Sequence, residues 1–189
     1  SRVEIEDASG LRAVVERVDG AHIVARADLE AELGKARAGI WASEALRIAA
    51  GRPRAFLDTD DRAIPNEVMV QVGSDRLGDH VHLAKGCYRG QETVARVHTL
   101  GRPPRRLTLL HIDGSVNHLP GVGEPVMFGE RAVGRLGTTA HHHEWGPIGL
   151  ALVKRNVPVG EVLTVDGVAA SQEVLVDPEV GLHVRPRLG

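Results

Sequence analysis

The sequence predicts a mixed α+β protein, in which an α/β portion is followed by a small antiparallel β-barrel. In the first half, apolar residues recur with the helical period in some segments and alternate with polar residues in others. In the second half, short apolar runs follow one another at regular spacing, separated by turn residues. The change of character falls at residues 101–104, which read Gly-Arg-Pro-Pro and are typical of a linker.

The first half is expected to contain short strands and three helices. Val3 and Ile5 alternate with glutamates, which is typical of a half-buried strand. Ser9 and Asp28 can cap two of the helices, and Gly51 can end the third. The expected elements are strand 3–5, helix 9–18, strand 22–25, helix 28–36, helix 40–50, a polar loop at 51–66, strand 67–72 and a turn at 73–79.

The second half is expected to supply the barrel. Asp166 and Gly167 form a strong two-residue hairpin signal, and Gly129 and Glu130 join two further runs. We therefore divide the chain into an α/β domain, residues 1–104, and a barrel domain, residues 105–189. The expected strands are 107–112, 126–128, 132–138, 148–153, 163–165, 168–170 and a closing run at 174–176.

The composition excludes several classes of protein. The 189 residues are 42% hydrophobic and 25% charged, which is ordinary for a globular protein. No apolar window is long enough for a transmembrane helix, and no secretory signal is recognised, so we expect a cytoplasmic protein without a membrane partner. A single cysteine, Cys87, excludes an internal disulfide framework and a zinc site built on several thiolates. Because the chain starts at Ser1, we expect a fragment or a processed product of something longer.

Positive charge is concentrated in one stretch of the chain. The net charge is −2, but residues 85–106 carry six basic side chains against a single acidic one. The arginines of this stretch lack the interleaved aromatic residues on which nucleic-acid bases stack. We therefore expect a solvated charge run beside the linker rather than direct binding of nucleic acid, formed by Arg96, Arg102, Arg105 and Arg106.

The most informative run is residues 85–92, which read Lys-Gly-Cys-Tyr-Arg-Gly-Gln-Glu. Lys85 and Arg89 lie near Cys87 in the sequence and would favour its thiolate. A helix that opened near Glu92 would add the partial positive charge of its free backbone N–H groups. The residue types alone leave open a reactive thiol and a small buried cysteine with a packing role.

This run resembles the signature of the YgfZ-type folate-binding proteins. That signature is lysine, glycine, cysteine, an aromatic residue, any residue, glycine, glutamine and glutamate, and every fixed position is present here. Flanking segments are also similar to the family, so that the resemblance extends from about residue 35 to about residue 155. These segments are 45–51, 64–67, 93–98, 101–107, 133–136 and 150–153.

The resemblance implies a function in iron–sulfur metabolism. YgfZ-type proteins belong to the superfamily of the glycine-cleavage T-protein, and their eukaryotic relatives serve mitochondrial iron–sulfur cluster assembly. The resemblance therefore implies an accessory protein, not a conventional catalyst, that supports cluster assembly or repair under oxidative stress and, through it, enzymes that modify tRNA. Implied partners are tetrahydrofolate or a derivative, iron–sulfur client proteins or assembly factors, and the N-terminal half of a longer parent protein. Residues 1–104 would then be a partial T-protein-like region with an incomplete folate site.

The resemblance also assigns roles to individual residues. Cys87 would be the functional thiol, and the other residues of the motif would support it or shape its site. Arg47 would contact a carboxylate or the polyglutamate tail of folate, because a guanidinium can hold a carboxylate through two hydrogen bonds; its alternative role is to tether a loop. The implied motif residues are Lys85, Gly86, Tyr88, Arg89, Gly90, Gln91 and Glu92, and the implied folate contacts are Arg47, Tyr88 and Glu92.

Two other functions stay open. One is a tetrahydrofolate-dependent aminomethyltransferase or demethylase, as in the transferases of the same superfamily. Their helix looks like Ala-Arg-Asp-x-Leu-Arg-x-Glu-Ala-Gly, whereas here Ser43 replaces the first arginine and Ala49 replaces the glutamate. The transferases also lack the cysteine signature. The other function is a pure interaction module in which Cys87 is structural.

Three further groups of residues are interpreted as structural. Successive side chains of a strand point to opposite faces, so the run 141–143 of three histidines lacks a clear third ligand and no metal site is predicted. Trp41 and Trp145 are expected to be packing residues. Four acidic residues are interpreted as a hydrated loop with the local partners Arg52, Arg54 and Arg62, rather than as acid–base groups or a cation site; they are Asp58, Asp60, Asp61 and Glu67.

Overall fold

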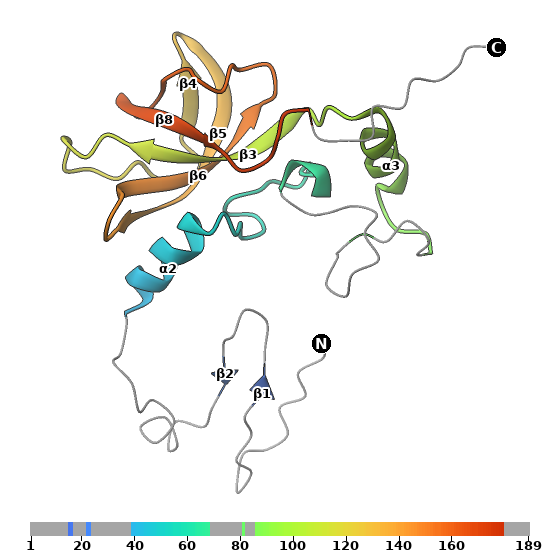
Figure 1. The fold of residues 1–189 in the computed structure, drawn as a ribbon, viewed down its shortest axis with the longest axis horizontal. Coiled ribbons are helices and arrows are strands. Elements are labelled where there is room, and N and C mark those ends of the chain that lie inside the picture. Colours follow the sequence, from blue (N-terminus) through green and yellow to red (C-terminus); the bar gives the residue numbers. More distant parts are fainter. Residues whose placement is uncertain (1–14, 17–21, 24–38, 69–80, 82–85, 180–189) are drawn as a thin grey trace, which may run out of the picture. The chain divides into compact units, whose positions relative to one another are not determined.

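A computed structural model describes residues 15–16, 22–23, 39–68, 81 and 86–179 (Figure 1). The chain divides into two compact units, Ser1–Gly39 and Ile40–Gly189. The domain boundary placed at 104/105 stays a prediction. The strand at 3–5, the helix at 28–36 and the turn at 73–79 fall outside the described residues.

The first unit contains a pair of short strands. β1 (Val15–Glu16) runs antiparallel to β2 (His22–Ile23), with Val15 opposite Ile23. The strand expected at 22–25 is confirmed at 22–23, whereas the helix expected over 9–18 is wrong at 15–16. Valine is stiff at χ1 and favours strands, so the helical spacing of apolar residues was misleading in this segment.

The second unit combines helices with a closed antiparallel barrel, which confirms the mixed α+β class. Its strand order is β3-β6-β5-β4-β7-β8, and β3 pairs with both β6 and β8 to close the ring. The elements in chain order are α2 (Ile40–Ala49), the 3₁₀ helix η2 (Pro65–Glu67), α3 (Gln91–Leu100), β3 (Arg105–Ile112), β4 (Pro125–Phe128), β5 (Arg131–His142), β6 (Gly146–Lys154), β7 (Leu163–Val165) and β8 (Val168–Val174).

The expected barrel strands are confirmed and are mostly longer than expected. The Asp166-Gly167 hairpin is also confirmed, because both residues have positive φ, 49° and 76°, as a two-residue type I′ turn requires. The closing strand expected at 174–176 is wrong as a separate element. β8 continues without a break to Val174 and pairs there with Thr108.

The two faces of β3 and β6 are both buried, which explains their nearly continuous apolar sequences. One face lines the barrel interior, where Leu110 and Val153 belong to one core cluster. The other face lies under α2, where Leu107 and Leu150 belong to a second cluster with Ile48 of the helix. α2 therefore lies on the outer surface of the barrel, in contact with β5 and β6 (Figure 1).

The end of α2 is fixed by its backbone. The N–H of Gly51 donates to the carbonyl of Ile48, and the N–H of Arg52 donates to the carbonyl of Arg47. With φ of 64° at Gly51, this is the Schellman arrangement that ends many helices. The helix expected at 40–50 is thus confirmed, and the chain turns sharply into the loop that carries Asp58.

The strand expected at 67–72 is wrong at its first two residues. Pro65 begins the 3₁₀ helix η2, and Glu67 returns its side chain to accept a hydrogen bond from the Ile64 N–H at 3.1 Å. Val68 follows as a turn, and residues 69–72 lie outside the described part.

The two tryptophans are not core residues. Trp41 of α2 is 78% exposed and Trp145 is 45% exposed, so the expected packing role is wrong for Trp41. Trp145 does contact the ring of His142, with the centroids 4.7 Å apart. In the described ranges, no helix has both the length and the apolar character that a membrane crossing needs.

Candidate functional site

The cysteine motif turns the chain directly into helix α3. Gly90 caps the helix with φ of 84° and ψ of 4°, a left-handed conformation that glycine adopts without steric cost. The N–H of Gln91 donates to the Tyr88 carbonyl at 3.3 Å, and the N–H of Val94 donates to the Gly90 carbonyl at 3.1 Å. A helix thus begins four residues after the thiol, with Gln91 as its first residue, whereas the sequence indicated such a helix only as a condition.

Cys87 lies in solvent, just before this helix. The interpretation of Cys87 as a small buried residue is therefore wrong. The cap residue Gly90 offers no side-chain hydrogen bond to the ten-residue helix, so the first turn of α3 keeps N–H groups that carry partial positive charge. Arg89 is also exposed, and Lys85 lies outside the described residues.

Three of the remaining motif residues, Tyr88, Gln91 and Glu92, are partly buried or already form an ion pair within the protein. Glu92 forms an exposed ion pair with Arg96, at 3.1 Å and one helical turn apart, which contributes little to stability. Tyr88 and Gln91 are half-buried. The roles of Tyr88 and Glu92 as folate contacts stay predictions.

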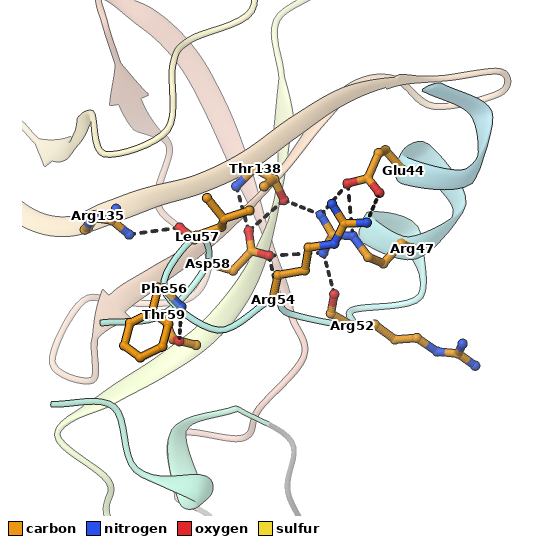
Figure 2. Close-up of polar contacts among 10 residues, drawn as sticks. All are labelled: Glu44, Arg47, Arg52, Arg54, Phe56, Leu57, Asp58, Thr59, Arg135 and Thr138. Atoms are coloured by element: carbon orange, nitrogen blue, oxygen red, sulfur yellow. Dashed lines mark hydrogen bonds and ion pairs between the residues drawn. The ribbon is translucent and has the colours of Figure 1, made fainter. Parts of the chain in front are cut away.

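Arg47 ties the loop after α2 to the barrel, as Figure 2 shows. Its Nε and Nη2 groups donate to Glu44, Nη1 donates to the Arg52 carbonyl and to Asp58, and Nη2 also donates to the Thr138 hydroxyl. These contacts use all five N–H groups of the guanidinium. The loop-tethering role is what this geometry shows. Contact with folate stays a prediction, and it would require this network to open.

Asp58 is the centre of this network. It is 1% exposed, and one carboxylate oxygen accepts from both the backbone N–H and the hydroxyl of Thr138, each at 2.6 Å. The other oxygen accepts from the Arg54 N–H at 2.8 Å and from Arg47 at 3.0 Å. The expected hydrated acidic loop is therefore wrong for Asp58, and it is also wrong for Glu67, which is fully buried.

A second ion-pair network surrounds Arg105. Its guanidinium donates to Asp60 and to the fully buried Glu67, whose carboxylate also accepts the Arg105 backbone N–H at 3.1 Å. Hydrogen bonds from Arg105 lower the pKa of Asp60, and the two carboxylates raise the pKa of Arg105. The network joins η2 to the start of β3, and Asp61 remains exposed beside it.

The solvated arginine run is confirmed at two positions and wrong at two. Arg96 pairs with Glu92 and Arg102 with Glu179, both on the surface. Arg105 is held between Asp60 and Glu67, and Arg106 is completely buried. The count of basic residues could not reveal this, because alternate residues of β3 face different environments.

The run of three histidines spans the end of strand β5 at His142, and it does not form a ligand set. His142 is buried, and its Nδ1 accepts hydrogen bonds from the N–H groups of Glu144 and Trp145, each at 3.3 Å. His141 and His143 are exposed. The residues that the structure describes contain no group of three or more His, Cys, Asp or Glu side chains suited to hold a metal ion.

Sequence reasoning missed the barrel side of the Asp58 network. Thr138 supplies two hydrogen bonds to Asp58, and Gly137 makes room for it, since a Cβ at residue 137 would lie 2.3 Å from an Asp58 carboxylate oxygen. A glycine inside a strand often marks such a close approach, and this was the one available signal.

Comparison with known proteins gives one distant relationship. No family model matches the chain. A chloroplastic protein of Arabidopsis thaliana, named as a "putative transferase", is 31% identical over 129 residues, a match that covers 67% of this chain and 27% of the plant protein. The chain is therefore distantly related to this plant protein and corresponds to about a quarter of its length.

Proposed function

We propose that the protein is a folate-binding accessory factor in the assembly or repair of iron–sulfur clusters. In this proposal it works in the cytoplasm, and its clients include the iron–sulfur enzymes that modify tRNA. The observation that carries the proposal is the exposed thiol of Cys87, which precedes α3 by four residues and lies within a complete eight-residue signature.

The position of the thiol suits chemistry with a partner. Thiolates are both the nucleophilic and the metal-binding form of cysteine, and a helix N-terminus favours them. Clusters usually require four protein ligands, so a lone cysteine could hold one only together with ligands from another molecule. Cys87 would therefore meet a client protein or a small thiol at the surface, where it is accessible.

Tetrahydrofolate or a derivative would be the small-molecule ligand. In the described residues, Arg47 is saturated by protein groups and Glu92 pairs with Arg96. These residues therefore do not form a complete folate site, and the proposal assigns the other contacts to the remainder of a longer parent protein. The motif would then contribute one wall of the site.

A folate-dependent aminomethyltransferase or demethylase is the second candidate. The transferase name of the plant relative favours it. The two candidates differ in a measurable way, because the transferase would turn over substrate with formation of methylene-tetrahydrofolate. The accessory factor would bind folate without that turnover.

The test is genetic complementation with the full-length parent protein. A host that lacks the gene receives the wild type, the Cys87→Ala variant or the Thr99→Ala variant, a matched control on the exposed part of α3. Iron–sulfur enzyme activity and the level of modified tRNA are measured under oxidative stress. The proposal expects rescue by the wild type and the control but not by Cys87→Ala at equal abundance.

Two outcomes would overturn the proposal. Equal rescue by all three proteins would make Cys87 structural. A deletion strain with normal iron–sulfur enzymes, combined with methylene-tetrahydrofolate formation by the purified parent protein, would establish the transferase instead.

A further inference from the structure

A surface cavity of about 300 Å³ lies at one end of the barrel, and the cysteine motif does not contribute to it. Its apolar wall includes Val133 and Val157, which belong to the interior core, and Phe128, which packs against that core. The apolar wall of the cavity is therefore continuous with the packed interior core of the barrel. The mouths of β-barrels are common places for small-molecule sites.

The charged groups that line the cavity are all cationic. The guanidinium of Arg131 makes no hydrogen bond or ion pair with the described residues, and no carboxylate lines the cavity. Lys154 donates one hydrogen bond, to the Ala132 carbonyl at 3.1 Å, which leaves two of its three N–H groups for a ligand. The exposed amide of Asn156 adds a further donor. An anion would thus find donors and positive charge without repulsion from the cavity wall.

A buried cation, Arg106, contacts the loop at residues 154–158, which lines the cavity. Arg106 is 0% exposed and donates to the carbonyls of Lys154, Arg155 and Val157 and to the side chain of Gln172, at 2.9 to 3.2 Å. These four acceptors are neutral, and Nε of Arg106 has no partner within the described part. These hydrogen bonds tie residues 154–157 to β3, and no carboxylate among the described residues pairs with the guanidinium of Arg106.

We infer that this cavity binds a small organic anion with an apolar body. The carboxylate or phosphate would be held between Arg131 and Lys154, and the apolar part would lie against Phe128 and Val133. Walls that are tied together by hydrogen bonds lower the cost of ordering the site, and charge-assisted hydrogen bonds supply most of the affinity. The inference is independent of the proposed function, because it uses none of the motif residues.

The test uses phenyl phosphate and benzoate as probes and benzyl alcohol as their neutral counterpart. Each is titrated into the ¹⁵N-labelled full chain while amide chemical shifts are recorded. At least one anion is expected to bind with a Kd of about 1 mM or tighter, to shift residues 128–133 and 154–158, and to bind more weakly as salt is added. The two anions together show whether the site prefers phosphate or carboxylate.

Variants separate a real site from general attraction to a positive surface. The double variant Arg131→Gln/Lys154→Gln should weaken binding about tenfold or more, whereas Arg96→Gln/Arg102→Gln, the matched loss of two exposed cations outside the cavity, should leave the Kd unchanged. Because both cavity cations are exposed, the variant should keep the wild-type spectrum elsewhere. Four outcomes would overturn the inference. They are binding of benzyl alcohol as tight as that of the anions, chemical-shift changes confined to other residues, equal effects of the two double variants on the Kd, and no binding of either anion.

Discussion

Asp58 and Thr138, which lie 80 residues apart in the sequence, meet through two hydrogen bonds of 2.6 Å to a single carboxylate oxygen. The second oxygen of Asp58 holds Arg47 and the Arg54 N–H (Figure 2). The contact fastens the loop after α2 to the middle of β5. Its strength can be measured, because exposed neighbours provide matched controls.

The Asp58→Asn variant should lower the free energy of unfolding by about 2 to 3 kcal/mol. The change removes a charge that is paired with the nearly buried Arg47 and places an amide NH₂ where an acceptor is needed. Urea denaturation measures the loss. Asp61→Asn, at an exposed position of the same loop, should stay within about 0.5 kcal/mol of the wild type. Equal losses in both variants would contradict the assigned role of Asp58.

The Gly137→Ala variant should lower the free energy of unfolding by about 2 kcal/mol or more. The added Cβ would lie 2.3 Å from the Asp58 carboxylate and 2.8 Å from its Cα, so the loop backbone would have to shift. Gly160→Ala is the control, because a Cβ there meets nothing within 4 Å. Urea denaturation compares the two variants, and a wild-type value for Gly137→Ala would show that the loop does not approach β5 this closely.

The ion pair of Asp60 with Arg105 should make stability depend on acid pH. A carboxyl whose folded pKa is lowered stabilises the protein above its unfolded pKa, about 3.9, and this contribution is lost as the pH falls through the folded pKa. The wild type should therefore lose more stability than Asp60→Asn between about pH 5 and about pH 2. Unfolding by urea at a series of pH values checks this, and parallel curves for the two proteins would refute it.

The Cys87 thiol should react with a maleimide or with Ellman's reagent in the native protein. Exposure makes the rate in buffer comparable to the rate in denaturant, rather than orders of magnitude slower, as it would be for a buried thiol. Cys87→Ser is the unreactive control and should change the free energy of unfolding by less than about 0.5 kcal/mol. Labelling that required prior unfolding would mean that the thiol is covered.

The barrel was predictable because its signals are local. The short apolar runs at regular spacing and the turn residues Asp166 and Gly167 act over a few neighbours, and these signals agree with the observed pairing. The segment at 15–16 was not predictable in this way, because the spacing of its apolar residues fits a helix while its valine favours a strand.

The partners in the two ion-pair networks could not be predicted from neighbouring residues in the sequence. Arg47 reaches a partner 91 residues away, and Arg105 reaches Glu67 across 38 residues. The nearby Arg54 and Arg62 contact the acidic residues of their own loop only through their backbone N–H groups in the described part of the chain. Likewise, the residue types around Cys87 left open a reactive thiol and a buried cysteine, so its exposure could not be predicted from the motif. Exposure depends on how the whole chain packs around that residue.

The closed ring of β3 to β8 limits how other molecules can join the barrel. Each of its six strands already has a neighbour on both sides, so the ring presents no edge strand with a free row of backbone donors and acceptors. Another chain cannot extend this sheet by adding a strand, which is a common route both to peptide recognition and to aggregation. Recognition at the barrel must therefore use side chains and the loops at its ends.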